Sequence, residues 1–442
     1  MRKASLLLCL LLPLTINAQQ LSIDAMIDRD MASMLSTYKM LHAAPELSHR
    51  EEKTSAFFAG ELRKLGYTVT ERLGKYENSA WTGYGVIAVL KNGTGPTVLV
   101  RTELDALPVD EKTGLPYASK VRVKNDAGVE VSVMHACGHD IHMTSLLATA
   151  KLLSELKSQW QGTLVLLGQP SEESGDGARA LLKDNLYTRF PQPDFAIALH
   201  DKPDIETGKI GYTPGYAMAS ATSIDINIRG IGGHGSAPET TKDPVVVAAQ
   251  VVMALQTIVS RENSPLDPAV VTVGSIHGGT RYNIIPDEVN LQLTVRTYKE
   301  DVRQKILASI ERIVKGAALT AGIPEDRAPI VKVSEGTKST YNEPKLLERL
   351  MPAFQKALGD DNVVKMPPMM ASEDFGYLSL DQKIPATIIW LGASEAQKVK
   401  AYRETGAAIP GLHSALFAPV PEPTLRTGVK ATTAAVLELM KK

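Results

Sequence analysis

The chain has 442 residues, more than a single hydrophobic core normally serves, so its length predicts two domains. Hydrophobic residues make up 44% and charged residues 22%, the balance of an ordinary globular protein with a sizeable core. The 48 basic and 49 acidic residues give a net charge of −1, which gives no reason to expect a nucleic acid or an anionic membrane as a partner.

Residues 1–18 differ in composition from the rest of the chain. Arg2 and Lys3 precede an apolar run over residues 6–14, and the small residue Ala18 ends the segment. These features are typical of a signal peptide, and the run is too short to span a bilayer comfortably. We therefore expect an exported protein, periplasmic or secreted, without membrane insertion in its mature form. A buried N-terminal helix is the alternative interpretation.

The chain contains two cysteines, Cys9 and Cys137. Removal of the signal segment would leave Cys137 as a single thiol, so no disulfide could form within the mature chain. A lone thiol in an oxidising compartment is liable to oxidation unless something occupies it. Coordination of a metal ion, which holds the thiolate as a ligand, would do so.

The chain from about residue 21 to residue 216 alternates helical and apolar strand patterns. This alternation is typical of a doubly wound α/β domain with a mostly parallel sheet. Leucines and alanines recur at helical spacing in residues 52–65 and 142–157. Short apolar runs predict buried strands at residues 98–100, 163–167 and 195–199.

Near residue 219 the pattern changes to an alternating strand, SIDINIRG, followed by the loop GIGGHGSAPETTKDP. The elements after this loop predict a compact antiparallel sheet covered by two helices on one face. They are a helix at 245–259, strands at 270–276 and 288–298, and a helix at 301–320.

The α/β pattern returns with a strand at 386–392 and a closing helix at 424–440. We therefore predict a main α/β domain in two parts, residues 19–218 and 333–442. A smaller α+β domain, residues 219–332, is inserted between them.

Polar groups that can bind metals or move protons gather where the predicted strands end. Open α/β sheets bind ligands at the carboxyl ends of their strands, so these groups are expected to converge. They are Glu103 and Asp105 after the first strand, His135, Cys137, His139, Asp140 and His142 in MHACGHDIH, Glu172 and Glu173 after GTLVLLGQP, His200 after DFAIAL, and His413 in PGLHSALFAP.

The residue types in this group favour a metal site. Thiolate, imidazole and carboxylate suit a borderline divalent ion such as zinc, and a turning backbone can aim both Cys137 and His139 at one centre. One ion needs three or four ligands and this set offers more, so two ions with a bridging ligand are the economical interpretation. Each residue alone also has a structural explanation, such as a buried thiol. His42, His49 and His277 keep the structural interpretation.

Eight segments occur in an order and at spacings that resemble the aminoacylase and carboxypeptidase G type of metallopeptidases. The closest subgroup is that of the amidohydrolases that include hippurate hydrolase and plant auxin-conjugate hydrolases. The resemblance covers nearly all of the chain after the signal segment. The segments are RTELDALP, MHACGHDIH, QPSEESGDGA, LHDKP, GIGGHGSAP, LDPAVVTVGSIHGGTRYNIIPD, ASEDFGY and GLHS.

The resemblance implies two divalent metal ions per chain and a homodimer formed through the inserted domain. Zinc is expected because of the thiolate, with manganese, nickel or cobalt as alternatives. The implied ligands are Cys137 as the bridge, together with His139, Glu173, His200 and His413.

The resemblance also implies roles for residues that do not bind metal. Glu172 would be the general base, and Asp105 would orient a ligand. His234 in GGHGS would reach an active site, that of the partner subunit, and stabilise the oxyanion. Asn283 and Arg296 lie in segments that resemble the family's contacts to the substrate carboxylate.

The expected reaction is hydrolysis of an amide bond beside a free carboxylate. Acylamino-acid deacylation and dipeptide or carboxypeptidase cleavage both stay open, because both kinds of substrate carry that carboxylate. Two other hypotheses are a cysteine hydrolase, with Cys137 as nucleophile and His139 as base, and a binding protein without turnover. Glu103 stands where the family usually has aspartate, and Glu239 where the subgroup usually has histidine. These departures concern the substrate more than the reaction.

Overall fold

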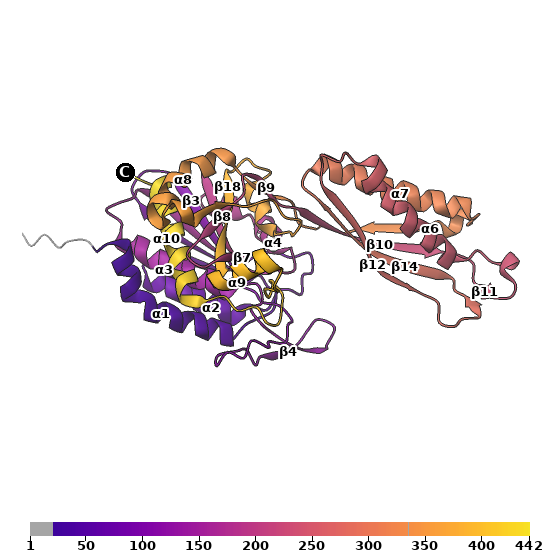
Figure 1. Cartoon of the computed structure of the whole chain (residues 1–442), viewed down its shortest axis with the longest axis horizontal. Helices are drawn as coiled ribbons and strands as arrows, with labels where there is room; N and C mark the ends of the chain where they lie inside the picture. Colours follow the sequence, from indigo (N-terminus) through magenta and orange to yellow (C-terminus); the bar gives the residue numbers. More distant parts are fainter. Residues whose placement is uncertain (1–20, 335) are drawn as a thin grey trace, which may run out of the picture.

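An eight-stranded sheet forms the centre of the larger part of the protein, in a computed structural model that describes residues 21–334 and 336–442 (Figure 1). The predicted signal segment lies outside the described residues, as does Cys9. In their spatial order, the strands are β1 (Thr68–Leu73), β2 (Gly85–Asn92), β6 (Gly162–Gln169), β3 (Thr97–Glu103), β7 (Phe195–Glu206), β18 (Ala386–Ser394), β8 (Ile210–Tyr212) and β17 (Val363–Lys365).

The four pairs β6–β3, β3–β7, β7–β18 and β8–β17 are parallel, and antiparallel pairs lie at β1–β2, β2–β6 and β18–β8. Both faces of this sheet are buried, which explains the continuous apolar runs in its strands. Val98 and Val100 of β3 face one core and Leu99 faces the other, as the two-residue period of a strand requires.

Helices cover both faces of the sheet. One face packs against α1 (Ile23–Ala43), α2 (Glu52–Lys64), α3 (His139–Glu155), α8 (Pro344–Leu358) and α10 (Pro421–Leu439). The other face packs against α4 (Gly177–Lys183), α5 (Leu186–Arg189) and the 3-10 helix η5 (Asp374–Ser379). The prediction of a doubly wound, mostly parallel α/β domain is confirmed. Helix α3 begins at His139, three residues before the predicted start, so the MHACGHDIH segment runs into its first turn.

The smaller part of the protein, the satellite body, has a four-stranded antiparallel sheet with one face covered by two helices (Figure 1). In spatial order its strands are β12 (Ala269–Gly278), β14 (Glu288–Thr297), β10 (Ser220–Arg229) and β15 (Ile330–Val333). The helices are α6 (Pro244–Thr257), continued by a π-helical turn at Ile258–Glu262, and α7 (Glu300–Thr320). This α+β arrangement agrees with the predicted fold class.

Short elements complete the chain. They are β4 (Arg122–Lys124) paired with β5 (Glu130–Ser132), β9 (Gly215–Met218) paired with β16 (Thr340–Asn342), β11 (Gly233–His234) paired with β13 (Ile284–Ile285), α9 (Ala396–Thr405), and the 3-10 helices η1 (Pro238–Thr240), η3 (Glu325–Arg327) and η4 (Asp360–Asn362).

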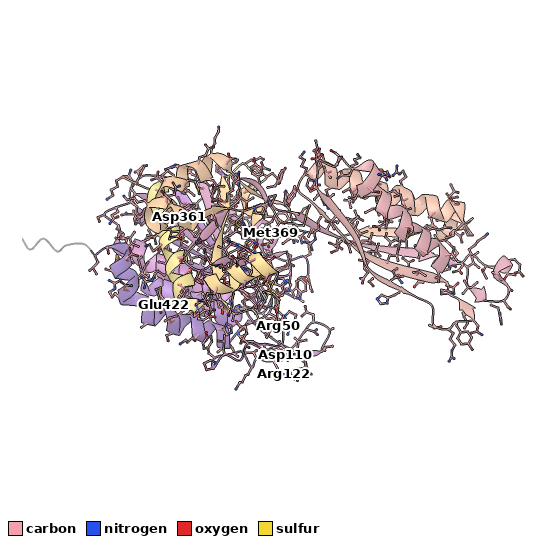
Figure 2. The ribbon with its side chains drawn as sticks, in the orientation of Figure 1. Arg50, Asp110, Arg122, Asp361, Met369 and Glu422 are labelled. Carbon is pink, nitrogen blue, oxygen red and sulfur yellow. The ribbon has the colours of Figure 1, made fainter. Side chains whose placement is uncertain are left out.

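The chain passes into the satellite body between β9 and β10 and returns after β15. At this junction the backbone N–H of Ala219 donates to the carbonyl oxygens of Met369, at 3.2 Å, and Ala371, at 2.9 Å. Met369 lies on the side of the larger body that faces the satellite body (Figure 2). The two ends of the satellite sheet therefore have different surroundings. The end with Arg296 adjoins the larger body, and the end with β11 projects away from it (Figure 1).

Candidate metal centre

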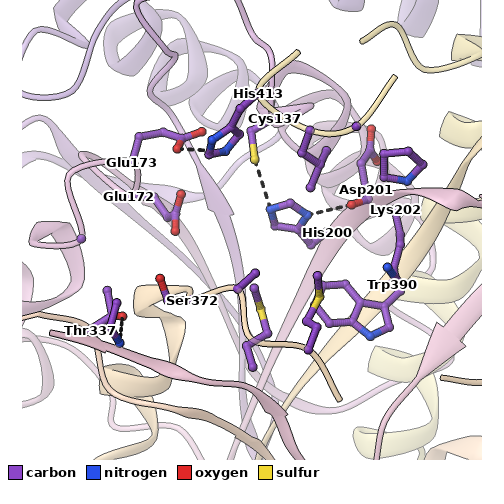
Figure 3. A pocket seen from close by; sticks show the side chains of 18 of the residues that line it. Cys137, Glu172, Glu173, His200, Asp201, Lys202, Thr337, Ser372, Trp390 and His413 are labelled. Atoms are coloured by element: carbon purple, nitrogen blue, oxygen red, sulfur yellow. Dashed lines mark hydrogen bonds and ion pairs between the residues drawn. The ribbon is translucent and has the colours of Figure 1, made fainter. Parts of the chain in front are cut away.

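A cavity of about 710 Å³ opens at the carboxyl ends of the central strands, between the larger body and the near end of the satellite sheet (Figure 3). One wall is made of four of the predicted metal-binding residues and Glu172, and the opposite wall comes from the satellite body and the segment around Ser372. The lining includes Cys137, Glu172, Glu173, His200, Lys202, Asp204, Met218, Arg296, Met369, Ser372, Trp390, Tyr402, Leu412 and His413.

The five predicted metal ligands converge in two groups that share one residue. Cys137, His139 and His200 form one group, and Cys137, Glu173 and His413 form the other; within each group the ligand atoms lie within 4.8 Å of one another. The Cys137 Sγ lies 3.5 Å from His200 Nε2, and His413 Nε2 lies 3.4 Å from a Glu173 oxygen (Figure 3). This is the arrangement expected of two ions bridged by one thiolate.

Hydrogen bonds on the far side of two imidazoles fix which nitrogen faces the centre. The His139 Nδ1–H donates to the carbonyl oxygen of Asp105 at 2.8 Å, and the His200 Nδ1–H donates to that of Asp201 at 2.9 Å. Because a carbonyl oxygen only accepts, each Nδ1 carries the proton and each Nε2 presents a lone pair to the centre. Within the described chain, His139 Nε2 and Glu173 Oε1 are buried without a hydrogen-bond partner.

The electrostatics of the centre also fit bound cations. Burial, followed by the charges of Glu173 and Glu172, raises the pKa of the Cys137 thiol well above its ordinary value. Burial, followed by the charges of Glu373 and Glu173, raises the pKa of Glu172 in the same direction. Acidic groups crowded together out of water are costly unless positive charge compensates them. Divalent ions held by Cys137, His139 and Glu173 would supply that charge.

Two backbone conformations aim the ligands. Gly138 has a φ of 85°, and a Cβ atom there would lie 2.5 Å from an Asp201 carboxylate oxygen, so the turn between Cys137 and His139 needs glycine. His413 has a φ of 65°, and its N–H donates to the Ala136 carbonyl oxygen at 2.8 Å. This bond joins the late loop directly to the MHACGHDIH segment.

Asp105 and Glu172 take up different positions around the ligands. The Asp105 carboxylate accepts hydrogen bonds from the Ser48 hydroxyl at 2.7 Å and the Glu173 N–H at 3.0 Å, and its backbone oxygen holds His139. Asp105 therefore contacts two predicted ligands without facing the cavity. Glu172 lines the cavity, with a carboxylate oxygen 3.8 Å from His139 Nε2.

The other three residues predicted to act outside the ligand set are separated in space. Arg296 lines the cavity and donates to the Ser372 hydroxyl at 3.0 Å. His234 and Asn283 are exposed on the β11–β13 ribbon at the far end of the satellite body (Figure 1). The structure therefore does not bring these two residues to the metal centre of their own chain.

The other histidines divide into buried and exposed ones. His42 bridges Asp140, at 2.7 Å, and Glu111, at 3.0 Å, and His142 donates to Glu103 at 2.9 Å. These contacts agree with a structural role. His135 is buried, His49 stacks on Trp81, and His277 is exposed on β12.

Two charged groups beside the cavity were not predicted. Lys202 lines the wall next to His200, paired with Asp204 at 2.8 Å, and Glu373 is buried beneath the centre. The ASEDFGY segment, which contains Glu373, is the only sequence signal that could have pointed to the second group.

Comparisons with known proteins agree with this centre. The model of Peptidase family M20/M25/M40 matches residues 99–405. The chain is 36% identical to N-acetyl-L-cysteine deacetylase of Bacillus subtilis (strain 168) over 364 residues, 81% of this chain and 80% of the relative. It is also 36% identical to hippurate hydrolase of Campylobacter jejuni over 341 residues, 76% of this chain and 82% of the relative.

A solved structure of a dinuclear metal-binding peptidase of the M20 family, from Bacillus subtilis, has a TM-score of 0.72 to this chain. It shares 26% sequence identity, with 93% of this chain and 99% of the other covered.

The fold and the site define a hydrolase of amide bonds that depends on two divalent metal ions. The chain belongs to Peptidase family M20/M25/M40, so the resemblance seen in its motifs is confirmed. As the relatives are hydrolases, the hypothesis of a binding protein without turnover is not supported.

Proposed function

We propose that this protein hydrolyses the amide bond of N-acyl amino acids, next to a free carboxylate, with two zinc ions in the centre around Cys137. The observation that carries the proposal is the pair of ligand groups sharing Cys137, with Glu172 beside them in the same cavity. The soft thiolate favours zinc over harder ions, although manganese, nickel or cobalt can occupy such ligands.

Each ion would have its own pair of ligands in addition to the shared Cys137. His139 and His200 would hold one ion, Glu173 and His413 the other, and Cys137 both. When bound, the ions acidify a shared water and polarise the amide carbonyl. Glu172 would accept a proton from the attacking water at its carboxylate and deliver it to the leaving nitrogen. Asp105 would keep His139 in the tautomer that binds metal.

Arg296 is the proposed anchor of the substrate carboxylate. Its side chain is half-buried in the cavity wall, and no acidic side chain of the described chain forms an ion pair with it. A guanidinium offers a planar fork of donors that matches a carboxylate. Arg296 therefore supports a substrate with a carboxylate on the satellite side of the scissile bond.

A dipeptidase or carboxypeptidase activity is the second candidate. The Lys202–Asp204 ion pair lines the cavity next to His200, and Asp204 could exchange its partner for the ammonium group of a peptide. A cysteine hydrolase is disfavoured, because the imidazole 3.5 Å from the thiol is that of His200, whose Nε2 belongs to the metal ligands in this account.

We further propose a homodimer formed by the satellite body. β12 is an edge strand, and apolar side chains are exposed on it and on α6, with Ile276 at 56% and Met253 at 71%. Exposed edges and apolar patches of this kind mark interfaces. Pro244–Glu262 is also long and apolar enough to cross a membrane, but it packs on the satellite sheet through Val251 and Leu255.

In such a dimer, the exposed β11–β13 ribbon of one subunit would enter the cavity of the other. His234 would donate to the developing oxyanion, and Asn283 would contact the substrate. This arrangement would account for the positions of His234 and Asn283, which lie in two of the motifs that resemble the family and far from the metal centre of their own chain.

The domain division and the destination of the protein are part of the same proposal. Residues 219–332 would form the dimerisation domain, between catalytic parts 19–218 and 333–442. Residues 1–18 would direct export to the periplasm or the medium, on the grounds of their basic start and short apolar run.

Substitution of Glu172 and of Cys137 should separate chemistry from metal binding. Glu172→Gln is expected to keep two zinc ions per chain and to lose activity by roughly 10²–10⁴-fold, since it removes only the proton acceptor. Cys137→Ala is expected to lose both metal and activity. Elemental analysis and assays with hippurate, N-acetyl amino acids and dipeptides measure these effects. Equal metal loss in both variants would contradict the assigned roles.

Replacement of Arg296 should weaken binding of carboxylate substrates specifically. Arg296→Met is expected to lower kcat/KM for hippurate by about 10–100-fold, mainly through KM, because a hydrogen bond to a charged group is lost. The matched control is the carboxamide of hippurate, for which both proteins should be equally slow. An equal loss on hippurate and its carboxamide would show that Arg296 does not bind the carboxylate.

Mixed dimers should reveal whether His234 acts across the interface. His234→Ala alone is expected to lose roughly 100-fold in kcat, the usual effect of removing an oxyanion donor. When His234→Ala and Glu172→Gln chains exchange subunits, half of the dimers carry one complete site, so about a quarter of the wild-type activity should return. Formation of mixed dimers without recovered activity would place His234 outside the partner's site.

A further inference from the structure

Beneath the metal centre lies a group of charged side chains that the proposed mechanism does not use. Arg101 and Glu103 come from β3, and Glu373 and Asp374 from the start of η5. All four are almost completely buried. One guanidinium faces three carboxyl groups in a place that water does not reach.

The hydrogen bonds of this group give both oxygens of two carboxyl groups a partner. Glu103 accepts from Arg101 at one oxygen and from His142, at 2.9 Å, at the other. Asp374 accepts from Gln169 Nε2 at 2.6 Å at one oxygen and from the Ala178 N–H at 2.9 Å at the other. Every oxygen of these two carboxyl groups therefore has at least one partner within the protein.

Glu373 is the exception. Its Oε1 accepts from Arg101 at 2.7 Å and from the Phe375 N–H at 3.0 Å. Within the described residues, its Oε2 is buried without any hydrogen-bond partner. A charged oxygen in that state needs a cation or a proton donor, because the loss of water is otherwise uncompensated.

The position of Glu373 indicates which cation that is. Glu373, Glu103 and His200 form a group whose ligand atoms lie within 4.8 Å of one another. Each oxygen of Glu103 already accepts a hydrogen bond, and His200 Nε2 faces the metal centre beside Cys137 (Figure 3). A carboxylate oxygen of Glu373 therefore lies within 4.8 Å of a ring nitrogen of His200, next to the metal centre.

We propose that Glu373 is a further ligand of the ion held by His139 and His200. This inference rests on the proposed function of the centre. With Cys137, that ion would have four protein ligands, whereas the ion at Glu173 and His413 would have three. Burial has the same asymmetry, since the side chain of His139 is 1% exposed and that of His413 is 56% exposed.

A consequence is that the two ions differ in affinity. The buried ion exchanges slowly and remains bound when a chelator removes the outer one. Glu373 is thus assigned to holding metal and not to proton transfer.

The test uses Glu373→Gln in the full-length protein, with zinc as the probe. The variant retains an oxygen that can accept from Arg101 and Phe375, and it loses the charged free oxygen. We expect wild type to bind two zinc ions with distinct affinities, and Glu373→Gln to bind the tighter one at least 10-fold more weakly. Competition with a chromophoric chelator measures both affinities, and cobalt substitution reports the change in coordination through the visible spectrum.

Asp374→Asn is the matched control. It changes a neighbouring carboxyl group of the same buried group, whose two oxygens are both already bonded within the protein. Both zinc affinities should therefore stay as in wild type. Glu373→Asp, which keeps the charge and withdraws the oxygen by one methylene, should weaken the same site and serves if Glu373→Gln does not fold.

The outcomes are distinguishable. Unchanged zinc affinities in Glu373→Gln and Glu373→Asp would overturn the inference and leave the proposed function intact. Equal weakening in Glu373→Gln and Asp374→Asn would also overturn it, since a general disturbance of the buried group would then be the cause. A wild-type protein that binds no zinc pair would overturn both the inference and the proposed function.

Discussion

The structure depends on how negative charge is compensated at one edge of a buried parallel sheet. Strand ends and the helix start at His139 bring Glu103, Glu172, Glu173 and the Cys137 thiol together out of water. Among the described arginines, only Arg101 forms an ion pair with a member of this group, Glu103. Carboxylates and thiolates crowded in this way are costly unless protons or cations compensate their charge, so bound metal ions would stabilise this part of the fold.

The larger body and the satellite body contribute to the site in different ways. Ligands on strands, on a helix start and on a loop bonded to Ala136 are fixed by the core of the larger body. The satellite body brings Arg296 to the cavity at its near end and carries His234 at its far end. A C2 dimer would unite these ends, because each subunit then supplies its far end to the other. The metal centre alone would not determine the substrate.

Much of the fold could be predicted from periodicity and strand ends. The strands around Leu99, Leu166 and Ile197 have continuous apolar runs because both sheet faces are buried, and these runs are hard to mistake at this length. The convergence of the five proposed metal ligands could be predicted because cysteine, histidine and paired glutamates are unusual after such strands, and because the order of the motifs resembles a known family. The start of α3 at His139 was harder to predict, because the turn at Gly138 sets that boundary.

The residues beneath the centre could not be predicted in the same way. Glu373 is remote in sequence from Arg101, and only tertiary packing shows that one of its oxygens is bonded and the other is not. Lys202 follows His200 by two residues, but its direction relative to the cavity depends on the path of β7 beyond the sheet. Side-chain direction and hydrogen-bond satisfaction are properties of the folded chain, and a pattern of residue types does not contain them.

The central claim, that one thiolate bridges two ions, is tested most directly by anomalous X-ray scattering from crystals of the zinc-loaded protein. The account predicts two zinc peaks, both about 2.3 Å from Cys137 Sγ, one beside His139 and His200 and the other beside Glu173 and His413. A single peak, or a second peak not bonded to Cys137, would contradict the bridged centre on which the proposed chemistry rests.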